Sequence, residues 1–269
     1  MSDSDCVLFL QWVLPKLRMR WSGFRRVRGQ VCKHLERRRK ELDLQDITAY
    51  RHYLQQHPKE WQVLDSLCRV SITRFYRDKA VFAFLAEEVL PSLIHQVQER
   101  SAQCLRLWSA GCASGEEPYS LALVWHLGLQ NTPQVGLHIL ATDADSQMIA
   151  RARKACYPFS SVKNLPQSWR ASAFNQSESS CCLKSEYCGS VEFSIHDVRS
   201  CVPNGPFDLI LCRNLAFTYF EETLQTEILL RMRKALVPGG VLAIGVHESL
   251  PSIDGLTIWS ERLGIYRRL

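Results

Sequence analysis

At 269 residues the chain is long enough for one large domain or two modest ones, and either can bury a hydrophobic core. Hydrophobic residues make up 46% of the sequence and charged residues 22%, a composition that excludes a disordered or low-complexity chain. The net charge of +6 is concentrated in residues 1–80, which hold 17 Lys and Arg against 9 Asp and Glu. This basic first third either meets an acidic partner or forms a solvated, arginine-rich helix face.

The cysteines and the apolar stretches limit the compartment and the class of site. Among the 11 cysteines no two are separated by two residues, so zinc-knuckle and thioredoxin patterns are absent and no metal site is expected. The thiols are expected to be reduced and to fill the core. Residues 6–14 lack the flanks of a secretory signal, and no apolar run approaches the ~20 residues that span a bilayer. We predict a cytoplasmic protein without membrane insertion.

The first third is expected to be helical over residues 7–90. The apolar positions that recur there at near-helical spacing are Val27, Val31, Leu35 and Leu42. A further helix is expected over about 46–57, ending before a proline, and another over about 78–90. The sequence therefore predicts a basic helical N-terminal domain over residues 1–92.

From about Cys104 short apolar strands alternate with helices. The expected strands are 105–110, 135–141, 191–195, 207–212 and 241–246, followed by an apolar alternation over 256–268. The expected helices are 116–129, 146–155 and 222–236. This alternation predicts a parallel α/β sheet covered on both faces, in a second domain over 93–269. Residues 156–190 fit it poorly, and we expect a connecting helix and a small inserted β-hairpin subdomain at about 170–190.

Small residues follow the first strand, beginning at Gly111, and they lead into two acidic residues, Glu116 and Glu117. Such residues let the backbone turn tightly and approach a ligand, and the helix behind them presents free N–H groups. The spacing of a dinucleotide site, Gly-x-Gly-x-x-Gly, is absent, and two carboxylates would repel a phosphate. They suit a ligand with a cationic amino-acid end, such as S-adenosylmethionine. Any tight turn between a strand and a helix would also require small residues.

Acidic residues follow the next two strands. A carboxylate at the end of a strand in an open α/β sheet can accept both hydroxyls of a ribose, whereas the helix that follows also needs an N-cap. We assign Asp143 to the ribose and Asp145 to the cap. Asp197, just beyond the strand that ends at Ile195, either reaches the adenine edge or belongs to a simple turn.

Polar residues interrupt the apolar pattern at two further places. Arg213 and Asn214 follow the most apolar strand, and packing in the core does not explain them. Residues 71–78 form a polar and aromatic stretch at the junction of the two predicted domains, where ligand clefts are common.

Taken in order, these stretches resemble the CheR-type chemotaxis receptor methyltransferases, which methylate glutamate side chains of proteins with S-adenosylmethionine. The matching stretches are Thr73 to Asp78, Ala113 to Ser120, Ala141 to Asp145, Phe207 to Asn214 and Leu236 to Gly240. The resemblance covers roughly residues 20–250. It implies a Rossmann-like class I methyltransferase sheet behind an all-helical domain, with an inserted β-subdomain that docks on a receptor tail in some members.

The resemblance also implies roles for individual residues. With Gly111 from the turn, the implied cofactor contacts are Thr73, Arg77, Glu116, Asp143, Asp197, Val198, Arg213 and Asn214. Arg77 is placed at the methyl-transfer site, near the sulfur and the incoming carboxylate. The second catalytic candidate is Tyr219, which corresponds to a tyrosine in the family's active site. This chain has one residue more than the family before Tyr219, so an alignment without a gap places Thr218 at the position of that tyrosine.

The acceptor is expected to be a carboxylate of a protein, which is ionised at pH 7 and needs no base, and Arg77 can hold it bidentately. The altered region around Tyr219 leaves open a small-molecule S- or O-methyltransferase, and for an alcohol or amine acceptor His247 is the nearest candidate base. A non-catalytic S-adenosylmethionine sensor is a third alternative. Nucleic acid is not expected as a partner, since the basic stretch lacks interleaved stacking aromatics. We expect the arginines at 37–39 to dock on an acidic helical partner.

Overall fold

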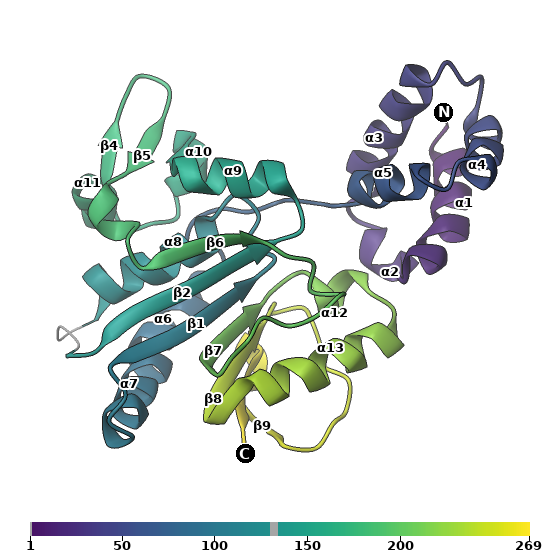
Figure 1. Cartoon of the computed structure of the whole chain (residues 1–269). Helices are drawn as coiled ribbons and strands as arrows, with labels where there is room; N and C mark the ends of the chain where they lie inside the picture. The colour runs from purple at the N-terminus through teal and green to yellow at the C-terminus, as the bar shows by residue number, and fades with distance from the viewer. Residues whose placement is uncertain (1, 130–133) are drawn as a thin grey trace. The chain divides into compact units, whose positions relative to one another are not determined.

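The computed structural model describes residues 2–129 and 134–269, which fall into two compact units (Figure 1). The helical unit runs to Ser71 and includes Thr218–Gln225, and the sheet unit comprises Ile72–Phe217 and Thr226–Leu269. The division between Ser71 and Ile72 differs from the boundary expected at residue 92. The reason is that the helical residues after 78 belong to the core of the sheet unit.

The helical unit is built as the sequence predicted, from short helices around a small core. Its elements are α1 (Asp3–Val13), the 3₁₀ turn η1 (Leu14–Leu17), α2 (Trp21–Phe24), α3 (Arg28–Glu41), α4 (Ile47–Gln56) and α5 (Glu60–Leu67). Asp46 caps α4 by accepting a hydrogen bond from the backbone N–H of Ala49 at 2.7 Å. Val31 and Leu35, two of the periodic apolar residues, are fully buried.

The arginines of α3 are largely engaged within the unit. Arg38 donates to both carboxylate oxygens of the buried Glu60, at 2.9 and 2.8 Å, and Arg39 pairs with Glu36 at 2.8 Å. Tyr50, which is completely buried, donates its hydroxyl to Glu60 at 2.9 Å. We call Arg38, Glu60 and Tyr50 the helical cluster. Arg38 therefore joins α3 to α5, whereas Arg39 pairs within α3 and donates to the carbonyl of Gln45. Docking of residues 37–39 on an acidic partner stays a prediction.

A segment from late in the chain completes the helical unit. The backbone N–H of Arg20 donates to the carbonyl of Tyr219 at 2.8 Å, and Met19 forms a β-bridge with Phe220. A Cβ atom on Gly23 would lie 2.2 Å from the carbonyl oxygen of Thr218, so the close approach requires a glycine.

The sheet unit holds a seven-stranded sheet in the order β6-β2-β1-β7-β8-β10-β9 (Figure 1). The strands are β1 (Cys104–Ala110), β2 (Gly136–Asp143), β6 (Val191–Ile195), β7 (Phe207–Cys212), β8 (Leu236–Ile244), β9 (Leu256–Ser260) and β10 (Ile265–Arg268). The first five pair in parallel, and β10 and β9 add an antiparallel edge. This confirms the predicted Rossmann-like α/β sheet.

Helices cover the sheet on both faces. The remaining helical elements are α6 (Lys79–Phe84), α7 (Leu90–Glu99), α8 (Glu116–Leu123), α9 (Ser146–Lys154), α10 (Phe159–Val162), α11 (Gln167–Ala173), α12 (Ala216–Tyr219) and α13 (Glu222–Ala235). Short π and 3₁₀ segments are η2 (Leu85–Val89), η3 (Val124–Gly128), η4 (Ser185–Tyr187) and η5 (Glu261–Leu263). α13 lies across β7 and β8 on the face opposite α7 (Figure 1).

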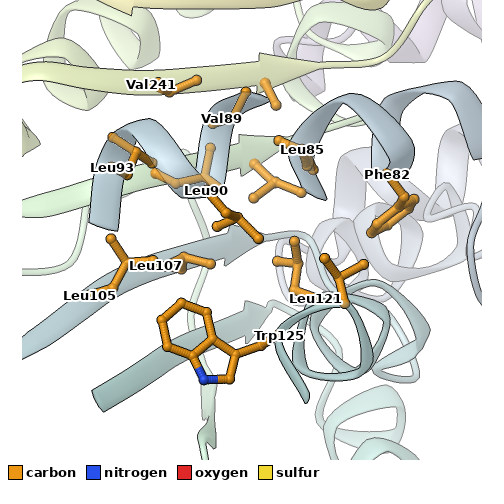
Figure 2. Packing of buried hydrophobic residues seen from close by; sticks show 14 of the residues in the cluster. Phe82, Leu85, Val89, Leu90, Leu93, Leu105, Leu107, Leu121, Trp125 and Val241 are labelled. Atoms are coloured by element: carbon orange, nitrogen blue, oxygen red, sulfur yellow. The ribbon is translucent and has the colours of Figure 1, made fainter. Parts of the chain in front are cut away.

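One long helix, residues 79–99, forms the centre of the core on its face of the sheet. It runs through α6, η2 and α7, and its buried apolar residues pack against β1, α8 and β8 (Figure 2). Those labelled in the figure are Phe82, Leu85, Val89, Leu90 and Leu93, each at most 1% exposed. By length and composition alone this helix is long and apolar enough to span a membrane, contrary to the prediction that no apolar stretch has that length. Its apolar side chains are instead occupied by packing against the sheet.

The inserted subdomain is larger than the predicted hairpin. β3 (Cys156–Tyr157), β5 (Cys181–Leu183) and β4 (Phe174–Gln176) form a separate three-stranded antiparallel sheet in that order. The insertion therefore begins near residue 156 rather than 170, because β3 follows α9 directly.

Four cysteines depart from the expectation of reduced thiols. Cys6 pairs with Cys32 between α1 and α3, and Cys156 pairs with Cys182 across β3 and β5. Buried free thiols that fill the core as predicted are Cys68, Cys112, Cys181 and Cys212.

Candidate active site

The carboxyl ends of the parallel strands gather most of the residues that the sequence singled out. β1 lies between β2 on one side and β7 on the other, so the order of the strands reverses there. Ligands of open α/β sheets bind in the crevice outside the strand ends at such a reversal. The turn from Gly111 to Glu116 follows β1, Asp143 ends β2, Asp197 follows β6, and Arg213 follows β7.

The turn after β1 has an unusual backbone. Gly111, Ala113 and Gly115 have positive φ angles of 75°, 47° and 92°. A Cβ atom on Gly111 would lie 2.5 Å from the side chain of Leu215, and one on Gly115 would lie 2.9 Å from that of Ala152. Both positions therefore require glycine for conformation and for space. The resulting turn is tight and almost wholly buried, as the small residues predicted.

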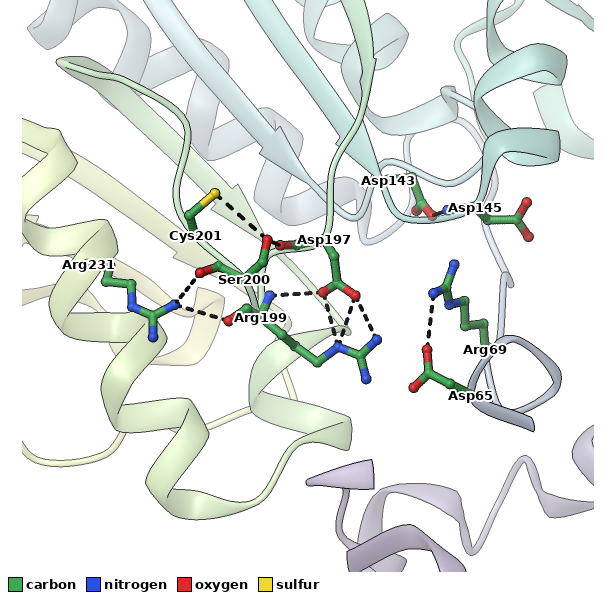
Figure 3. Close-up of polar contacts among 9 residues, drawn as sticks. All are labelled: Asp65, Arg69, Asp143, Asp145, Asp197, Arg199, Ser200, Cys201 and Arg231. Atoms are coloured by element: carbon green, nitrogen blue, oxygen red, sulfur yellow. Dashed lines mark hydrogen bonds and ion pairs between the residues drawn. The ribbon is translucent and has the colours of Figure 1, made fainter. Parts of the chain in front are cut away.

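Asp143 and Asp145 divide their tasks between turn and helix (Figure 3). Asp145 is the N-cap of α9 and accepts hydrogen bonds from the backbone N–H groups of Gln147 and Met148, which confirms its predicted role. The carboxylate of Asp143 accepts from the N–H of Ala113 at 2.9 Å and from that of Asp145 at 2.9 Å. Asp143 thus ties the β1 turn to the end of β2, and its binding of a ribose stays a prediction.

Glu116, the first residue of α8, is the most enclosed acid of the turn. Its side chain is 3% exposed and accepts hydrogen bonds from the hydroxyls of Ser114, at 2.8 Å, and of Thr73. Burial raises the pKa of this carboxyl above its ordinary value, and the two hydroxyl groups offset part of that rise. A buried carboxylate of this kind suits a cationic amino group. The residues present therefore fit the amino-acid end of S-adenosylmethionine, and the structure brings Thr73 and Glu116 together as predicted.

Arg213 is surrounded by acidic side chains and backbone of the sheet unit, and its contact with the cofactor stays a prediction. Its side chain is 2% exposed, and its two amino groups contact Asp78 at 2.6 Å, Glu117 at 3.1 Å and the carbonyl of Arg77 at 3.2 Å. Glu117 also accepts from the hydroxyl of Ser109 at 2.8 Å. We call Arg213, Asp78 and Glu117 the strand-end cluster.

Asn214 lies in the left-handed region with φ of 56°. Its backbone N–H donates to Glu248 at 2.9 Å, and the same carboxylate oxygen accepts from the N–H of Gly245 at 2.6 Å. A Cβ atom on Gly245 would lie 2.6 Å from the side-chain amide of Asn214. Glu248 therefore fixes the backbone beyond the ends of both β7 and β8.

Asp197 pairs with Arg199, two residues further along the chain (Figure 3). The closest contact is 2.6 Å, and the neighbouring Val198 is buried. The guanidinium of Arg231 on α13 donates to the carbonyls of Arg199 and Ser200, which fixes this loop. The contacts of Asp197 and Val198 with an adenine ring stay predictions.

The two catalytic candidates lie in different units. Arg77, in the sheet unit, is half-buried and donates one side-chain hydrogen bond, to the carbonyl of Ile72 at 2.8 Å. Tyr219, in the helical unit, packs its ring 5.0 Å from that of Phe24. Their catalytic roles stay predictions. The candidate base His247 is exposed.

Two acidic residues with clear positions in the site, Asp78 and Glu248, had no role assigned from the sequence. Glu117, which the sequence analysis grouped with Glu116 as suited to a cationic ligand, contacts Arg213. Helix geometry could have separated Glu117 from Glu116. Adjacent residues on a helix point about 100° apart, so the two carboxylates do not both face the same group of a ligand. No group of three or more potential metal ligands occurs among residues 2–129 and 134–269.

Comparisons with known proteins agree with this arrangement. Residues 71–262 match the family described as CheR methyltransferase, SAM binding domain. Over 261 residues the chain is 30% identical to chemotaxis protein methyltransferase 2 of Vibrio cholerae, covering 95% of this chain and 88% of that protein. It is 31% identical over 236 residues to the chemotaxis protein methyltransferase of Escherichia coli, with 84% and 78% covered.

A third relative shows the same similarity within a much longer protein. The chain is 31% identical over 243 residues to an uncharacterized 104.1 kDa protein of Rhodobacter capsulatus, which covers 90% of this chain but only 25% of that protein. The family match extends over far more than half of the chain and includes every strand end described above. The chain belongs to the CheR methyltransferase family and is an S-adenosylmethionine-dependent methyltransferase.

Proposed function

We propose that the chain transfers a methyl group to a carboxylate, a glutamate side chain, of a protein acceptor. The cofactor supplies an electrophilic methyl group on a sulfonium, so the acceptor must be a nucleophile aligned with the methyl–sulfur bond. A carboxylate is already ionised at pH 7 and requires no base. The relatives named as chemotaxis protein methyltransferases support a protein acceptor.

The observation that supports the proposal is the small number of hydrogen bonds made by the Arg77 side chain. Its single side-chain hydrogen bond among the described residues, to Ile72, leaves part of the guanidinium fork for a ligand. A guanidinium binds a carboxylate with two parallel hydrogen bonds, which orients the nucleophile for attack. Thr73, four residues earlier, contacts Glu116, so this stretch adjoins the predicted cofactor turn.

Labelling a native lysate with the purified protein and radioactive cofactor tests the proposal. We expect label in the macromolecular fraction that mild base releases as methanol, as for a methyl ester. Arg77→Lys keeps the charge but loses the fork, so we expect a rate about 100-fold lower. Arg74→Lys, at an exposed position of the same stretch, is the matched control. Label confined to small thiols or alcohols would contradict the proposal and favour the small-molecule alternative.

We further propose that an acidic surface of the acceptor docks on the helical unit. Since Arg38 and Arg39 are engaged, the arginines to consider are Arg25 and Arg26, which are exposed beside α2. Opposite charges at such a rim mainly raise the association rate and make it sensitive to salt. The double variant Arg25→Glu/Arg26→Glu is expected to raise KM for the protein acceptor without changing cofactor affinity.

A variant with the same change in net charge provides the control for that experiment. Lys234→Glu/Arg262→Glu alters two exposed residues of the sheet unit. Equal losses in both double variants would show that only net charge matters, and the docking proposal would then be wrong.

A further inference from the structure

The backbone on both sides of Arg77 is held in a conformation that L-residues rarely adopt. Tyr76 and Asp78 have φ angles of 55° and 60°, so Arg77 lies between two left-handed residues. Such a conformation persists only where the surrounding structure fixes it. The contacts of this segment therefore show what determines the direction of the Arg77 side chain.

Two elements of the sheet unit fix the segment. The N–H of Tyr76 donates to the hydroxyl of Ser120 on α8 at 2.9 Å. One amino group of Arg213 then contacts both the carbonyl of Arg77, at 3.2 Å, and the carboxylate of Asp78, at 2.6 Å. Asp78 precedes α6 but makes no side-chain cap for that helix, because its carboxylate is directed to Arg213.

We call the contacts of Arg213 with Asp78 and with the carbonyl of Arg77 the clamp. The other amino group of Arg213 connects the clamp to α8, the helix that follows the turn at residues 111–116. It contacts Glu117 at 3.1 Å, and Glu117 also accepts from the hydroxyl of Ser109 near the end of β1. The guanidinium lies 5.6 Å from the ring centre of Phe82. The side chain of Arg213 is only 2% exposed, and both of its amino groups are held by protein acceptors, whereas its buried Nε has no hydrogen-bond partner among the described residues.

We propose that Arg213 is a positioning residue for methyl transfer, whose guanidinium orients Arg77 through the Arg77 carbonyl and Asp78 instead of contacting the cofactor. Glu117 sets the position of that guanidinium relative to β1 and α8. The inference rests on the proposed role of Arg77 in holding the acceptor carboxylate, but it does not depend on which protein is the acceptor.

Two substitutions test the clamp from opposite sides in the full-length protein. Arg213→Lys keeps the charge but cannot span both carboxylates, and Asp78→Asn removes the charge that the clamp holds. In each we expect turnover to fall about 100-fold, as for a small displacement of a catalytic group, while the Kd for the cofactor stays within a few-fold. The double variant should be no slower than the slower single one, because both changes break the same contact.

Hydrogen exchange supplies a readout that needs no acceptor. Peptides covering residues 73–84 should exchange faster in both variants, with no change in β2 and β6. The matched control is Arg262→Lys, which alters an exposed arginine of the same unit and should change neither rate. If Arg213→Lys does not fold, Asp78→Asn carries the test alone, since Asp78 is partly exposed.

Three results would separate the possible failures. A loss of cofactor affinity as large as the loss of turnover would overturn the inference and indicate direct contact with the cofactor. Unchanged exchange over residues 73–84 together with slow turnover would also overturn it. If the wild-type protein labels no macromolecule, the proposed function fails, and the exchange experiment still decides whether the clamp exists.

Discussion

The helical unit and the sheet unit each contain an arginine paired with carboxylates, partly buried in the first and buried in the second, but in different structural settings. In the helical cluster Arg38 and Tyr50 bond to Glu60, and the three residues belong to the regular helices α3, α4 and α5. In the strand-end cluster Arg213 contacts Asp78 and Glu117, and Asp78 lies on irregular backbone beside Arg77.

The difference concerns what each ion pair holds in place. Burial opposes ionisation of Glu60, yet the hydrogen bonds from Arg38 and Tyr50 lower its pKa below the ordinary value. The helical cluster therefore keeps Glu60 ionised and holds α3, α4 and α5 together in the folded unit. The strand-end cluster fixes a short segment that carries a candidate catalytic group. We expect damage to the first cluster to appear as lost stability, and damage to the second as lost turnover.

Removing Glu60 should give the largest effect on stability. Glu60→Ala leaves the buried hydroxyl of Tyr50 without its acceptor and Arg38 with only the exposed Glu41, and breaking a buried pair typically costs about 3–5 kcal/mol. Urea unfolding followed by circular dichroism measures this loss. A cost below that of ordinary surface substitutions would show that the cluster is not structural, and the comparison would fail.

The pH dependence of the Glu60 variant sharpens the same test. Because folding lowers the pKa of Glu60, its contribution is present above the ordinary carboxyl pKa and is lost as the pH falls through the lowered value. The difference between wild type and Glu60→Ala should therefore shrink in acid. Asp3→Asn, in an exposed pair with Arg28, is the control and should cost less than about 1 kcal/mol at any pH.

Gly115→Ala should give the next largest effect, now in the sheet unit. Alanine would have to adopt a φ near 92° with its Cβ atom 2.9 Å from that of Ala152. Backbone strain and overpacking each cost about 1–3 kcal/mol, so we expect a loss of more than about 2 kcal/mol. Thermal unfolding with and without the cofactor measures it. A variant with unchanged Tm and cofactor affinity would show that the turn is not constrained as described.

Glu116→Gln should change cofactor binding and stability in opposite directions. Loss of a charged partner for the cofactor's amino group should weaken binding by about 10-fold to 100-fold, measured by calorimetry. Because folding raises the pKa of Glu116, its ionisation destabilises the protein as the pH rises above the ordinary carboxyl value. The cofactor-free variant should therefore have a higher Tm than wild type at pH 8 and an equal one in strong acid. A lower Tm at pH 8 would contradict this account.

The order of elements in the sheet unit could be predicted from the sequence because its apolar runs are short and bounded. The strands 191–195 and 207–212 were predicted at their observed bounds, and the α9 cap at Asp145 was identified. The boundary at residue 92 failed for a physical reason. The helix at 79–99 has the amphipathic pattern of the helices before it, and only its packing against β1 and β8 assigns it to the sheet unit.

In the candidate site, too, the positions of residues at strand ends could be predicted, but contacts between distant parts of the sequence could not. The turn at 111–116 and Asp143 lie at the predicted strand ends because parallel strands bring their carboxyl ends to one edge. The contacts of Arg213 were not predictable, since its partners Asp78 and Glu117 lie 135 and 96 residues away. Neither the small sheet of β3, β4 and β5 nor the Cys156–Cys182 disulfide had a periodic signal in residues 156–190.

Gly29→Ala should give the smallest effect, and its sign is opposite to that of Gly115→Ala. Gly29 is the second residue of α3, and a Cβ atom placed on it meets no atom within 4 Å. Its φ lies outside the left-handed range, so alanine can adopt the native backbone and restricts the unfolded chain. We expect a gain of about 0.5–1 kcal/mol in urea unfolding, with unchanged methyl transfer. A loss of stability would mean that the start of α3 packs against a group that these contacts do not include. Gly23→Ala, six residues earlier in the same unit, is the matched contrast, because its Cβ would meet the carbonyl of Thr218 and must destabilise.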